Sequence, residues 1–500
     1  MDAMPARPTG PDPRAPRRLR RAGALVMATA LATGVGALTA GTALAAPAAA
    51  RTTVVVVAPH GDDRAAGDVR HPLATVAAAV RRLPDGGSVM LRGGRYGERV
   101  SLGPAVHDLV LRPYGKEHPV LDGAGLVAPD GRSAMVAVDG SRSVTVRGLE
   151  ITGYRTKALD AMPIGIYVHG AAQDVTLRDN HVHAMGNDNP TLGSYDLNAH
   201  GIAVYGDSVE HPITGLAIED NEVDHLVLGA SESVVVNGNV DGWRVTGNDI
   251  HDNNNIGIDA IGYEGTLPEP YRYTDLNRAR HGVIEGNTVR NIISKGNPTY
   301  YEDGGWCNCA DGIYVDGGTS IRVERNTVTG SDIGVEVAAE NARGSADHVL
   351  VSRNLITRSA YVGIATGGYC NGDEACGGER TGVAHDNRFE HNTLYANNQL
   401  DDGSPEVLVQ YYVSRTTFEH NRVWATNDDR AVLGTQPGTE DDGVSTPLVA
   451  DHNTYWTTGG HRKQATFASL GTTYTGFDTY RKATGQDRHS RFAKFRVPKH

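Results

Sequence analysis

Three carboxylates lie in short segments of one kind in the middle of the chain. Asp259, Asp316 and Glu336 belong to the segments NIGIDAIG, ADGIYVDG and DIGVEVAA, in which Gly precedes alternating aliphatic and other residues. Two carboxyl groups within reach of one scissile bond, one protonated and one ionised, are what hydrolysis of a glycosidic bond uses. These three side chains can act on one bond only if the elements that carry them bring them close together.

The alternation predicts β-strands whose second and fourth residues after Gly face outward. Asp259 and Glu336 take the second position on strands expected two coils apart, so their backbones would be ~9.6 Å apart. Asp316 takes the fourth position on the strand between them, ~8 Å from Asp259. Like-charged neighbours would raise the pKa of one carboxyl and make it the acid. A solvated acidic face and a Ca²⁺ site are the alternatives.

Four further residues are candidates near these acids. Tyr314 and Asn237 take the same outward positions on neighbouring strands and are predicted to contact the substrate. Asp311 precedes its Gly, a position with the parity of the core face, where two other segments have His200 and Glu232. Asp252 precedes an Asn-rich turn and is either a second carboxylate of that coil or a turn-capping residue.

Aromatic residues are concentrated in the inserted segments 186–199, 263–280 and 295–310, which flank the acidic strands. Tyr271, Tyr273 and Trp306 belong to them, in a protein with only 6 Phe. Rings with an apolar face and a polar edge suit stacking on sugars, although they also anchor loops. The sequence thus predicts a groove with acids on its floor and aromatic rings on its rim.

A repeated Asn indicates what positions these segments. It occurs in the pattern VTLRDNHV, LAIEDNEV, WRVTGNDI and similar segments, at 180, 221, 248, 287, 326, 354, 392 and 421. The gaps are 41, 27, 39, 39, 28, 38 and 29 residues, so the shortest unit has 27 residues and the excess lies in loops. Asn tolerates left-handed backbone, and its amide bonds to an equivalent residue one coil away. We expect a ladder of Asn at one corner of each coil.

Units this short cannot bury their aliphatic faces alone and must stack. The first residue after Gly is Ile166, Ile202, Ile258, Ile313, Val335 or Ile364, an aliphatic stack. The predicted fold is an all-β, single-stranded, right-handed parallel β-helix over residues 46–500. Helical spacing between Pro72 and Pro84 predicts an N-terminal capping helix over 72–83. Residues 455–500 are expected to form an irregular C-terminal cap.

The chain resembles a known group of proteins. The segment GGSVMLRGGRYGERV after the predicted helix, the Asn-bearing coils and the tail YRKATGQDRHS resemble the secreted parallel β-helix proteins of the pectate-lyase-like superfamily, over residues 52–490. The Gly-Ile-Asp and Asp-Gly-Ile-Tyr-Val-Asp strands also resemble bacterial β-helix glycosidases of the lacto-N-biosidase type. The resemblance implies the fold and a carbohydrate-active protein, but it transfers no catalytic residue.

The N-terminus predicts export. Arginines between 14 and 21, an apolar stretch over 22–39 and Ala43-Leu44-Ala45 indicate a signal peptide over residues 1–45. Removing its six Arg and two Asp changes the formal net charge from −12 to −16. We expect a secreted, extracellular monomer that binds neither nucleic acid nor membranes. Cys307, Cys309, Cys370 and Cys376 should form disulfides, with Cys370–Cys376 preferred.

Three functions are compatible with this pattern. The first is a glycoside hydrolase that uses two of Asp259, Asp316 and Glu336 and needs no cofactor. The second is a polysaccharide lyase with Tyr314 as base, which would need Ca²⁺ or basic residues to neutralise a uronate. The third is a non-catalytic glycan-binding β-helix. The outward positions of these strands have no Lys or Arg, which favours the hydrolase.

Overall fold

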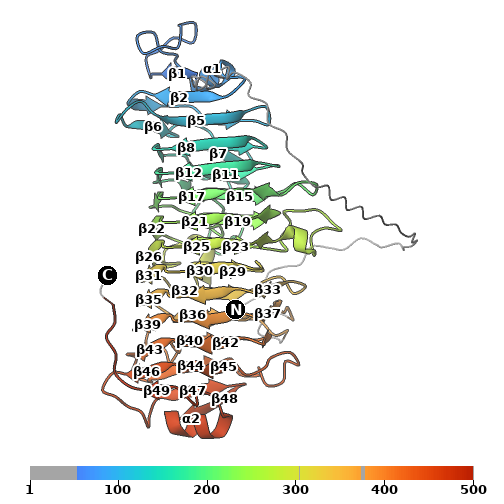
Figure 1. Ribbon diagram of the computed structural model, residues 1–500, viewed down its shortest axis with the longest axis vertical. Helices are drawn as coiled ribbons and strands as arrows, with labels where there is room; N and C mark the ends of the chain where they lie inside the picture. Colours follow the sequence, from blue (N-terminus) through green and yellow to red (C-terminus); the bar gives the residue numbers. More distant parts are fainter. Residues whose placement is uncertain (1–52, 303, 373–377, 499–500) are drawn as a thin grey trace, which may run out of the picture.

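The chain winds into a long stack of coils. The computed structural model describes residues 53–302, 304–372 and 378–498, so the predicted signal peptide lies outside the described residues. Nearly every strand pairs in parallel with the strand one coil away, and three long sheets, named A, B and C, run the length of the tube (Figure 1). The predicted parallel β-helix is confirmed.

Each full coil contributes one strand to each sheet. Sheet A contains β1 (Val54–Val57), β2 (Gly87–Leu91), β5 (His107–Pro113), β8 (Arg142–Arg147), β12 (Gln173–Arg178), β17 (Ala217–Glu219), β21 (Arg244–Thr246), β25 (Val283–Glu285), β30 (Arg322–Glu324), β34 (Leu350–Ser352), β38 (Arg388–Glu390), β42 (Thr417–Glu419) and β45 (Val449–Asp451), with β16 (Ile213–Thr214), β20 (Val240–Asp241) and β24 (Ala279–Arg280) beside them. Sheet B contains β3 (Gly94–Tyr96), β6 (Pro119–Asp122), β9 (Glu150–Thr152), β13 (His181–His183), β18 (Glu222–Asp224), β22 (Asp249–Asn253), β26 (Thr288–Ile292), β31 (Thr327–Thr329), β35 (Leu355–Thr357), β39 (Thr393–Tyr395), β43 (Arg422–Ala425), β46 (Thr454–Thr457) and β49 (Arg491–Phe492).

Sheet C carries the predicted acids. It contains β4 (Val100–Leu102), β7 (Gly131–Asp139), β11 (Ala161–His169), β15 (His200–Gly206), β19 (Val234–Gly238), β23 (Ile258–Ile261), β29 (Asp311–Asp316), β32 (Ile333–Ala338), β36 (Val362–Thr366), β40 (Val407–Val409), β44 (Ala431–Thr435), β47 (Thr466–Ser469) and β48 (Thr472–Thr475). Smaller sheets are β10 (Arg155–Thr156) with β14 (Gly186–Asn187), β27 (Tyr301–Glu302) with β28 (Gly305–Trp306), and β33 (Ser345–Asp347) with β37 (Val383–His385) and β41 (Val413–Ser414).

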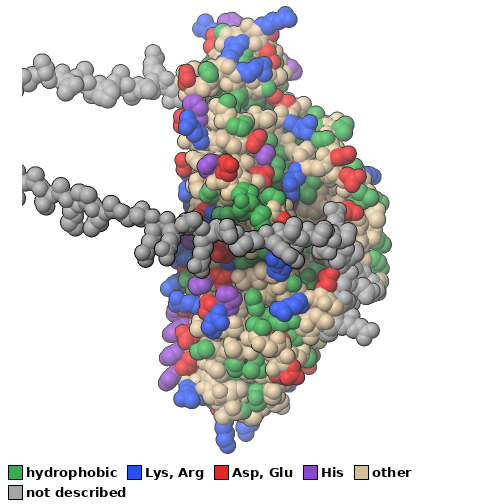
Figure 2. Space-filling view, turned by 90° about the vertical axis from the view of Figure 1, so that its right-hand side faces the viewer, with side chains coloured by type: hydrophobic (Ala, Val, Ile, Leu, Met, Phe, Trp, Pro, Cys, Tyr) green, Lys and Arg blue, Asp and Glu red, His purple; other side chains and the backbone are tan. Residues whose placement is uncertain are grey.

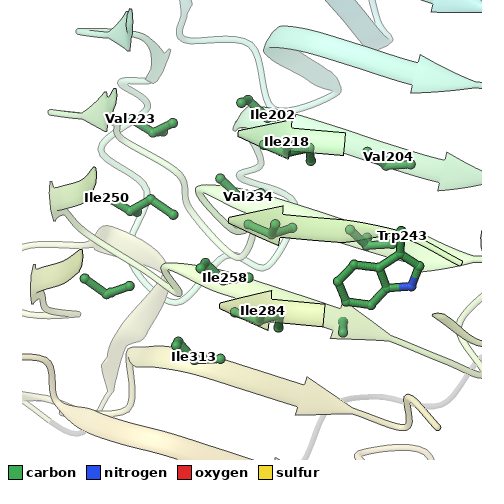
Figure 3. Close-up of a cluster of buried hydrophobic side chains, with 14 of the residues drawn as sticks. Ile202, Val204, Ile218, Val223, Val234, Trp243, Ile250, Ile258, Ile284 and Ile313 are labelled. Atoms are coloured by element: carbon green, nitrogen blue, oxygen red, sulfur yellow. The ribbon is translucent and has the colours of Figure 1, made fainter. Parts of the chain in front are cut away.

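The core is a column of aliphatic side chains inside the tube. Ile202, Val234, Ile258 and Ile313 follow one another on successive strands of sheet C, in register. Val223 and Ile250 from sheet B, and Ile218 and Ile284 from sheet A, meet them from the other walls (Figure 3). The predicted aliphatic stack is therefore confirmed. Every coil buries its residues against both neighbouring coils, as a solenoid requires.

The predicted Asn ladder is present and longer than expected. Each ladder Asn donates from Nδ2 to Oδ1 of the next, at 2.9–3.4 Å. Asn453 follows Asn421 and extends the column that the sequence pattern ended at 421. Left-handed backbone occurs at the residue before each Asn, such as Asp220 (φ 52°) and His420 (φ 60°), and not at the Asn itself. The Asn stabilises the corner through its buried amide.

Both ends of the tube are covered. Helix α1 (Val76–Arg81) lies inside the segment 72–83, its N-cap Thr75 accepts a hydrogen bond from the amide of Ala78, and it packs against β1, β2 and β4. At the other end, residues 455–498 are more regular than expected, because they contain β46 to β49 and helix α2 (Phe477–Thr484). Phe477 and Tyr480 of α2 are buried against Phe467. Two short 3₁₀ helices, η1 (Asp275–Asn277) and η2 (Pro298–Tyr300), lie in the inserted loops.

Within the described ranges, no helix combines the length and the apolar character needed to cross a bilayer.

Candidate active site

Sheet C places the predicted acids together. Asp259 on β23 is opposite Tyr314 on β29, which is opposite Glu336 on β32, so the three lie in one column across three coils. Asp316 lies two residues further along β29. The side chains of Asp259, Asp316 and Glu336 are all buried, since each residue is at most 5% exposed. The predicted register, with Asp259 and Glu336 two coils apart on one face, is confirmed.

Asp311 lies on the same outer face as these acids. The prediction that the residue before Gly faces the core is therefore wrong. Residues of that position, such as Ile164 and Ile333, pack with outward residues of the strand and not with the interior column. The cause is visible at Gly201, where the amides of Gly201 and Ile202 both bond to the carbonyl of Ser233, at 3.1 and 2.9 Å. One extra residue in the strand reverses the alternation at that point.

Asp311 and Glu336 form a hydrogen-bonded carboxyl pair. Burial raises the pKa of Asp311 well above its usual range, and the charge of Glu336 and the bond between the two groups raise it further. Burial raises the pKa of Glu336 to about 8, although the hydrogen bond from Asp311 acts in the opposite direction. Two buried carboxyls in contact retain a shared proton, because both cannot ionise together. At neutral pH the pair therefore holds an acidic proton.

Asp316 accepts a backbone hydrogen bond within the cluster. Burial and the charge of Glu340 raise the pKa of Asp316 well above its usual range, whereas the hydrogen bond of 2.7 Å from the backbone amide of Glu340 to its Oδ1 acts in the opposite direction and favours the charged form. Burial and the charges of Glu232 and Asp316 likewise raise the pKa of Asp259 well above its usual range. The buried Oδ1 atoms of Asp259 and Asp311 have no hydrogen-bond partner among the described residues.

Carboxylates that sequence reasoning did not select complete the cluster. Burial and then the charge of Glu264 raise the pKa of Glu340 to about 7. Glu264 accepts a hydrogen bond from Asn237 Nδ2 at 2.6 Å, and Asn237 Oδ1 accepts one from Thr266 at 2.6 Å. Glu264 and Glu340 follow β23 and β32 by two or three residues. The only feature of the sequence that could have indicated these two residues is their position just after acidic strands. The alternation of the strands has ended there and no longer predicts which way a side chain points.

Glu232 and His200 extend the cluster toward the N-terminal coils. Burial raises the pKa of Glu232 well above its usual range. His200 lies 3.4 Å from Glu232 Oε2 and 3.2 Å from the hydroxyl of Tyr205. Burial lowers the pKa of His200 to about 3, so the ring is neutral. The guanidinium of Arg132 lies 4.2 Å from the centre of the Tyr205 ring.

Tyrosines from loops lie beside the acids. The charge of Glu340, followed by burial, raises the pKa of Tyr369, whose residue is 46% exposed. Burial and then the charge of Glu340 raise the pKa of Tyr300. The Tyr195 and Tyr300 rings make an edge-to-face contact with centroids 5.9 Å apart. Tyr369 follows β36 and was not selected from the sequence, because it lies outside the three predicted insertions.

Two of the three predicted loop aromatics contact other loop side chains. Tyr273 lies under the guanidinium of Arg343, 3.7 Å from the ring centre, and Tyr271 is 38% exposed. Trp306 makes an edge-to-face contact with Tyr301 at 4.8 Å. A role for these three in substrate binding stays a prediction.

Asp252 is not part of the site. It lies on β22 of sheet B, with left-handed backbone (φ 54°), and bonds to His251 Nδ1 at 2.7 Å and Asn291 Nδ2 at 3.0 Å. Its carboxylate contacts side chains on another wall of the tube, so Asp252 is not a second carboxylate of the acidic coil.

A disulfide lies in the loop that leads to Asp311. Cys307 and Cys309 are bonded to each other. The amide of Cys309 donates to Ser294 Oγ at 3.2 Å, and Ser294 Oγ donates to Asp332 at 2.6 Å. Cys370 is also disulfide-bonded, whereas Cys376 of the preferred pair lies outside the described residues.

Possible metal ligands converge elsewhere. Among the described residues, three ligating atoms lie within 4.8 Å of one another in two groups, His181 with Glu222 and Asp224 on sheet B, and Asp451 with His452 and His489 near the C-terminus. The acids of sheet C are close enough to shift each other's pKa values, and their largest electrostatic influences are other carboxylates. This arrangement suits proton transfer in a site of low dielectric constant.

Comparison with solved structures agrees with the fold. A crystal structure of the GH136 lacto-N-biosidase from Eubacterium ramulus is similar over 80% of this chain and 67% of that chain, with 15% identity and a TM-score of 0.54. Pectate lyase Pel9A covers 79% of this chain and 81% of its own, with 13% identity and a TM-score of 0.37. The first similarity shows a right-handed parallel β-helix.

No family model matches the sequence. The uncharacterized protein YwoF of Bacillus subtilis (strain 168) is 33% identical over 444 residues, which are 87% of this chain and 87% of that protein. At this identity and coverage the chain belongs to the same family as YwoF.

Proposed function

We propose that the protein is a secreted glycoside hydrolase that acts on a neutral glycan. The observation that carries the proposal is the Asp311–Glu336 pair, which keeps a proton at neutral pH beside Asp316, whose Oδ1 accepts a backbone hydrogen bond that favours its charged form. A protonated carboxyl and an ionised carboxylate are the two groups that glycosidic cleavage needs. The glycosidase among the structural neighbours, a GH136 lacto-N-biosidase, agrees with a carbohydrate substrate.

In this reaction the acid pair gives its proton to the glycosidic oxygen while the bond from that oxygen to the anomeric carbon breaks. Asp316, in its ionised form, would act as the second carboxylate, either by attacking the anomeric carbon or by taking a proton from the attacking water. Tyr195, Tyr300 and Tyr369 offer ring faces for the sugars. Several carboxyls in one cluster would repel a uronate, so a neutral sugar fits better.

A lyase is the second candidate, with Tyr314 as the base. Burial and the charges of Asp316 and Glu340 raise the pKa of Tyr314 well above its usual value of 10. A tyrosine that stays protonated is a poor base at neutral pH. The environment of Tyr314 therefore argues for the hydrolase.

The test is a panel of neutral and uronic-acid glycans incubated with the mature protein. We expect new reducing ends without ultraviolet-absorbing unsaturated products. Asp311→Asn, Glu336→Gln and Asp316→Asn should each lower kcat by roughly 10²–10⁴-fold, the usual effect of removing an acid or base. Asp252→Asn is the matched control and should keep full activity, because its side chain lies on sheet B.

Unsaturated products would instead identify a lyase, and binding without turnover would identify a glycan-binding protein. Full activity in all three site variants would exclude the assigned acids.

A further inference from the structure

A second motif repeats in the C-terminal coils, away from the acids of sheet C. Three successive coils have an acidic residue, His and Asn in a row, as Glu390-His391-Asn392, Glu419-His420-Asn421 and Asp451-His452-Asn453. The Asn residues belong to the buried ladder. The acidic residues and histidines precede it at the corner between sheets A and B, and the proposed hydrolase has no use for them.

The fold aligns both polar columns. Glu390, Glu419 and Asp451 end β38, β42 and β45 and are in register from coil to coil. Each histidine has left-handed backbone, with φ of 59°, 60° and 59°, so the three side chains leave the corner in the same direction. Their ring centroids are 4.9 Å apart at both steps. Figure 2 shows histidine side chains, in purple, along the lower part of one edge of the molecule.

His489 continues the column beyond the last complete coil. It follows α2 in the chain, and its ring lies 5.0 Å from that of His452. The next residue, Ser490, takes the place of the ladder Asn, because its Oγ accepts the hydrogen bond from the amide of Asn453 at 2.7 Å. The C-terminal segment therefore repeats the geometry of a coil corner and brings a further imidazole to Asp451.

Asp451, His452 and His489 form a cluster of metal-ligand type. One ligating atom of each lies within 4.8 Å of the others. Asp451 Oδ2 is 2.7 Å from His489 Nδ1 and 3.7 Å from His452 Nδ1. Its Oδ1 accepts hydrogen bonds from the amides of His452 and His489, at 2.8 and 2.7 Å, which fix the carboxylate. The two imidazoles are 50% and 68% exposed, so an ion can reach them.

We propose that Asp451, His452 and His489 bind a divalent transition-metal ion, with Zn²⁺ the best match. Two imidazole nitrogens and a carboxylate oxygen are common Zn²⁺ ligands, and the imidazoles must be neutral to bind. The ion would replace the hydrogen bond between His489 and Asp451. His489 follows α2, whereas Asp451 ends β45 and His452 comes directly after it, so the ion would tie the C-terminal cap to the last coil.

The test is isothermal titration of ZnCl₂ into the mature chain without a histidine tag, at pH 7.5. We expect saturable binding that His452→Asn and His489→Ala each weaken ~10-fold or more, as loss of a metal-site group does. Zn²⁺ should also raise the melting temperature of the wild type but not of the double variant. Asn is chosen for residue 452 because it tolerates left-handed backbone.

His348→Asn is the matched control. His348 has the same left-handed backbone (φ 56°) and also follows an aspartate, but Asp347 is bonded to Arg278. Its loss should leave Zn²⁺ binding unchanged. A zinc ion bound at His181, Glu222 and Asp224 would remain in every variant. The proposal therefore concerns only the zinc ion that the wild type binds and the double variant does not. No Zn²⁺ binding by the wild type, or the same stoichiometry and affinity in the double variant, would overturn it.

Discussion

The proton held by Asp311 and Glu336 affects stability as well as reactivity. In the unfolded chain Glu336 would have a pKa near 4.5, whereas in the folded protein it is raised to about 8. Between these values the folded state keeps a proton that the unfolded state releases. The free energy of unfolding therefore falls as the pH rises through this range, and this loss is complete above about pH 8.

We predict that thermal denaturation shows a lower midpoint at pH 8 than at pH 5, and that Glu336→Gln makes this decrease smaller because Gln does not titrate. Glu210→Gln, a change of an exposed glutamate, is the control and should leave the decrease unaltered. If the denaturation midpoint depends on pH in the same way in the wild type and in Glu336→Gln, the Glu336 carboxyl does not keep its proton in the folded protein.

The residues of this site could be predicted only in part. Asp259, Asp316 and Glu336 followed from alternation, because side chains of a regular strand face opposite sides in turn. Asp311 was assigned the wrong parity, since the bulge at the Gly position is a backbone feature that residue types do not encode. Glu340 and Glu264 were missed because they lie just beyond the strands, where loop geometry and not periodicity sets direction.

Among the elements, the Asn ladder connects coils that are 27 to 41 residues apart in sequence. Asn287 illustrates its contacts. Its Nδ2 donates to the carbonyl of Val245 and to Asn326, and its Oδ1 accepts bonds from the backbone amide and the side chain of Asn248, all at 2.9–3.0 Å. Removing the amide leaves buried backbone groups without partners, which costs more than the bonds themselves contribute.

We predict that Asn287→Ala lowers the free energy of unfolding by roughly 2–5 kcal/mol, measured by urea denaturation. Thr288→Ala, at the next and exposed position, should change it by less than ~0.5 kcal/mol. Equal stability of the two variants would mean that the ladder does not stabilise the corner.

The strands and the ladder were the most predictable elements, because a repeated pattern fixes both period and register. The C-terminal region was less so. Helix α2 has only eight residues and no repeat, and its burial depends on aromatic contacts with Phe467 that are made in three dimensions. The left-handed corner residues are Asp, Gly, Arg or His in different coils, so no single residue type identifies them.

At the scale of the whole molecule, stability is a sum over coils and their interfaces, and the ends have one neighbour instead of two. The C-terminal end is closed by Phe477, which is fully buried and lies 5.5 Å from the Phe467 ring and 5.6 Å from the Tyr455 ring. Losing this side chain uncovers the last coil but leaves the central coils with both of their neighbours.

We predict that Phe477→Ala costs about 3–5 kcal/mol locally, as large-to-small changes in a core do. In hydrogen exchange, β44, β46 and β47 should lose protection first, while β12 and β17 keep the wild-type rate. Uniform loss of protection along the tube would instead indicate that the molecule unfolds as one cooperative unit.

The direction of the Asn bonds has a consequence for the molecule as a whole. Every ladder amide directs one of its two N–H groups toward the next, C-terminal coil and its oxygen toward the preceding coil, so the side-chain dipoles add as backbone dipoles do along an α-helix. The column ends with Asn453 donating to the buried carboxyl of Asp487 at 3.1 Å. An acidic group thus occupies the electropositive pole, as an aspartate does at the first turn of a helix, and the tube carries an electrical polarity along its axis.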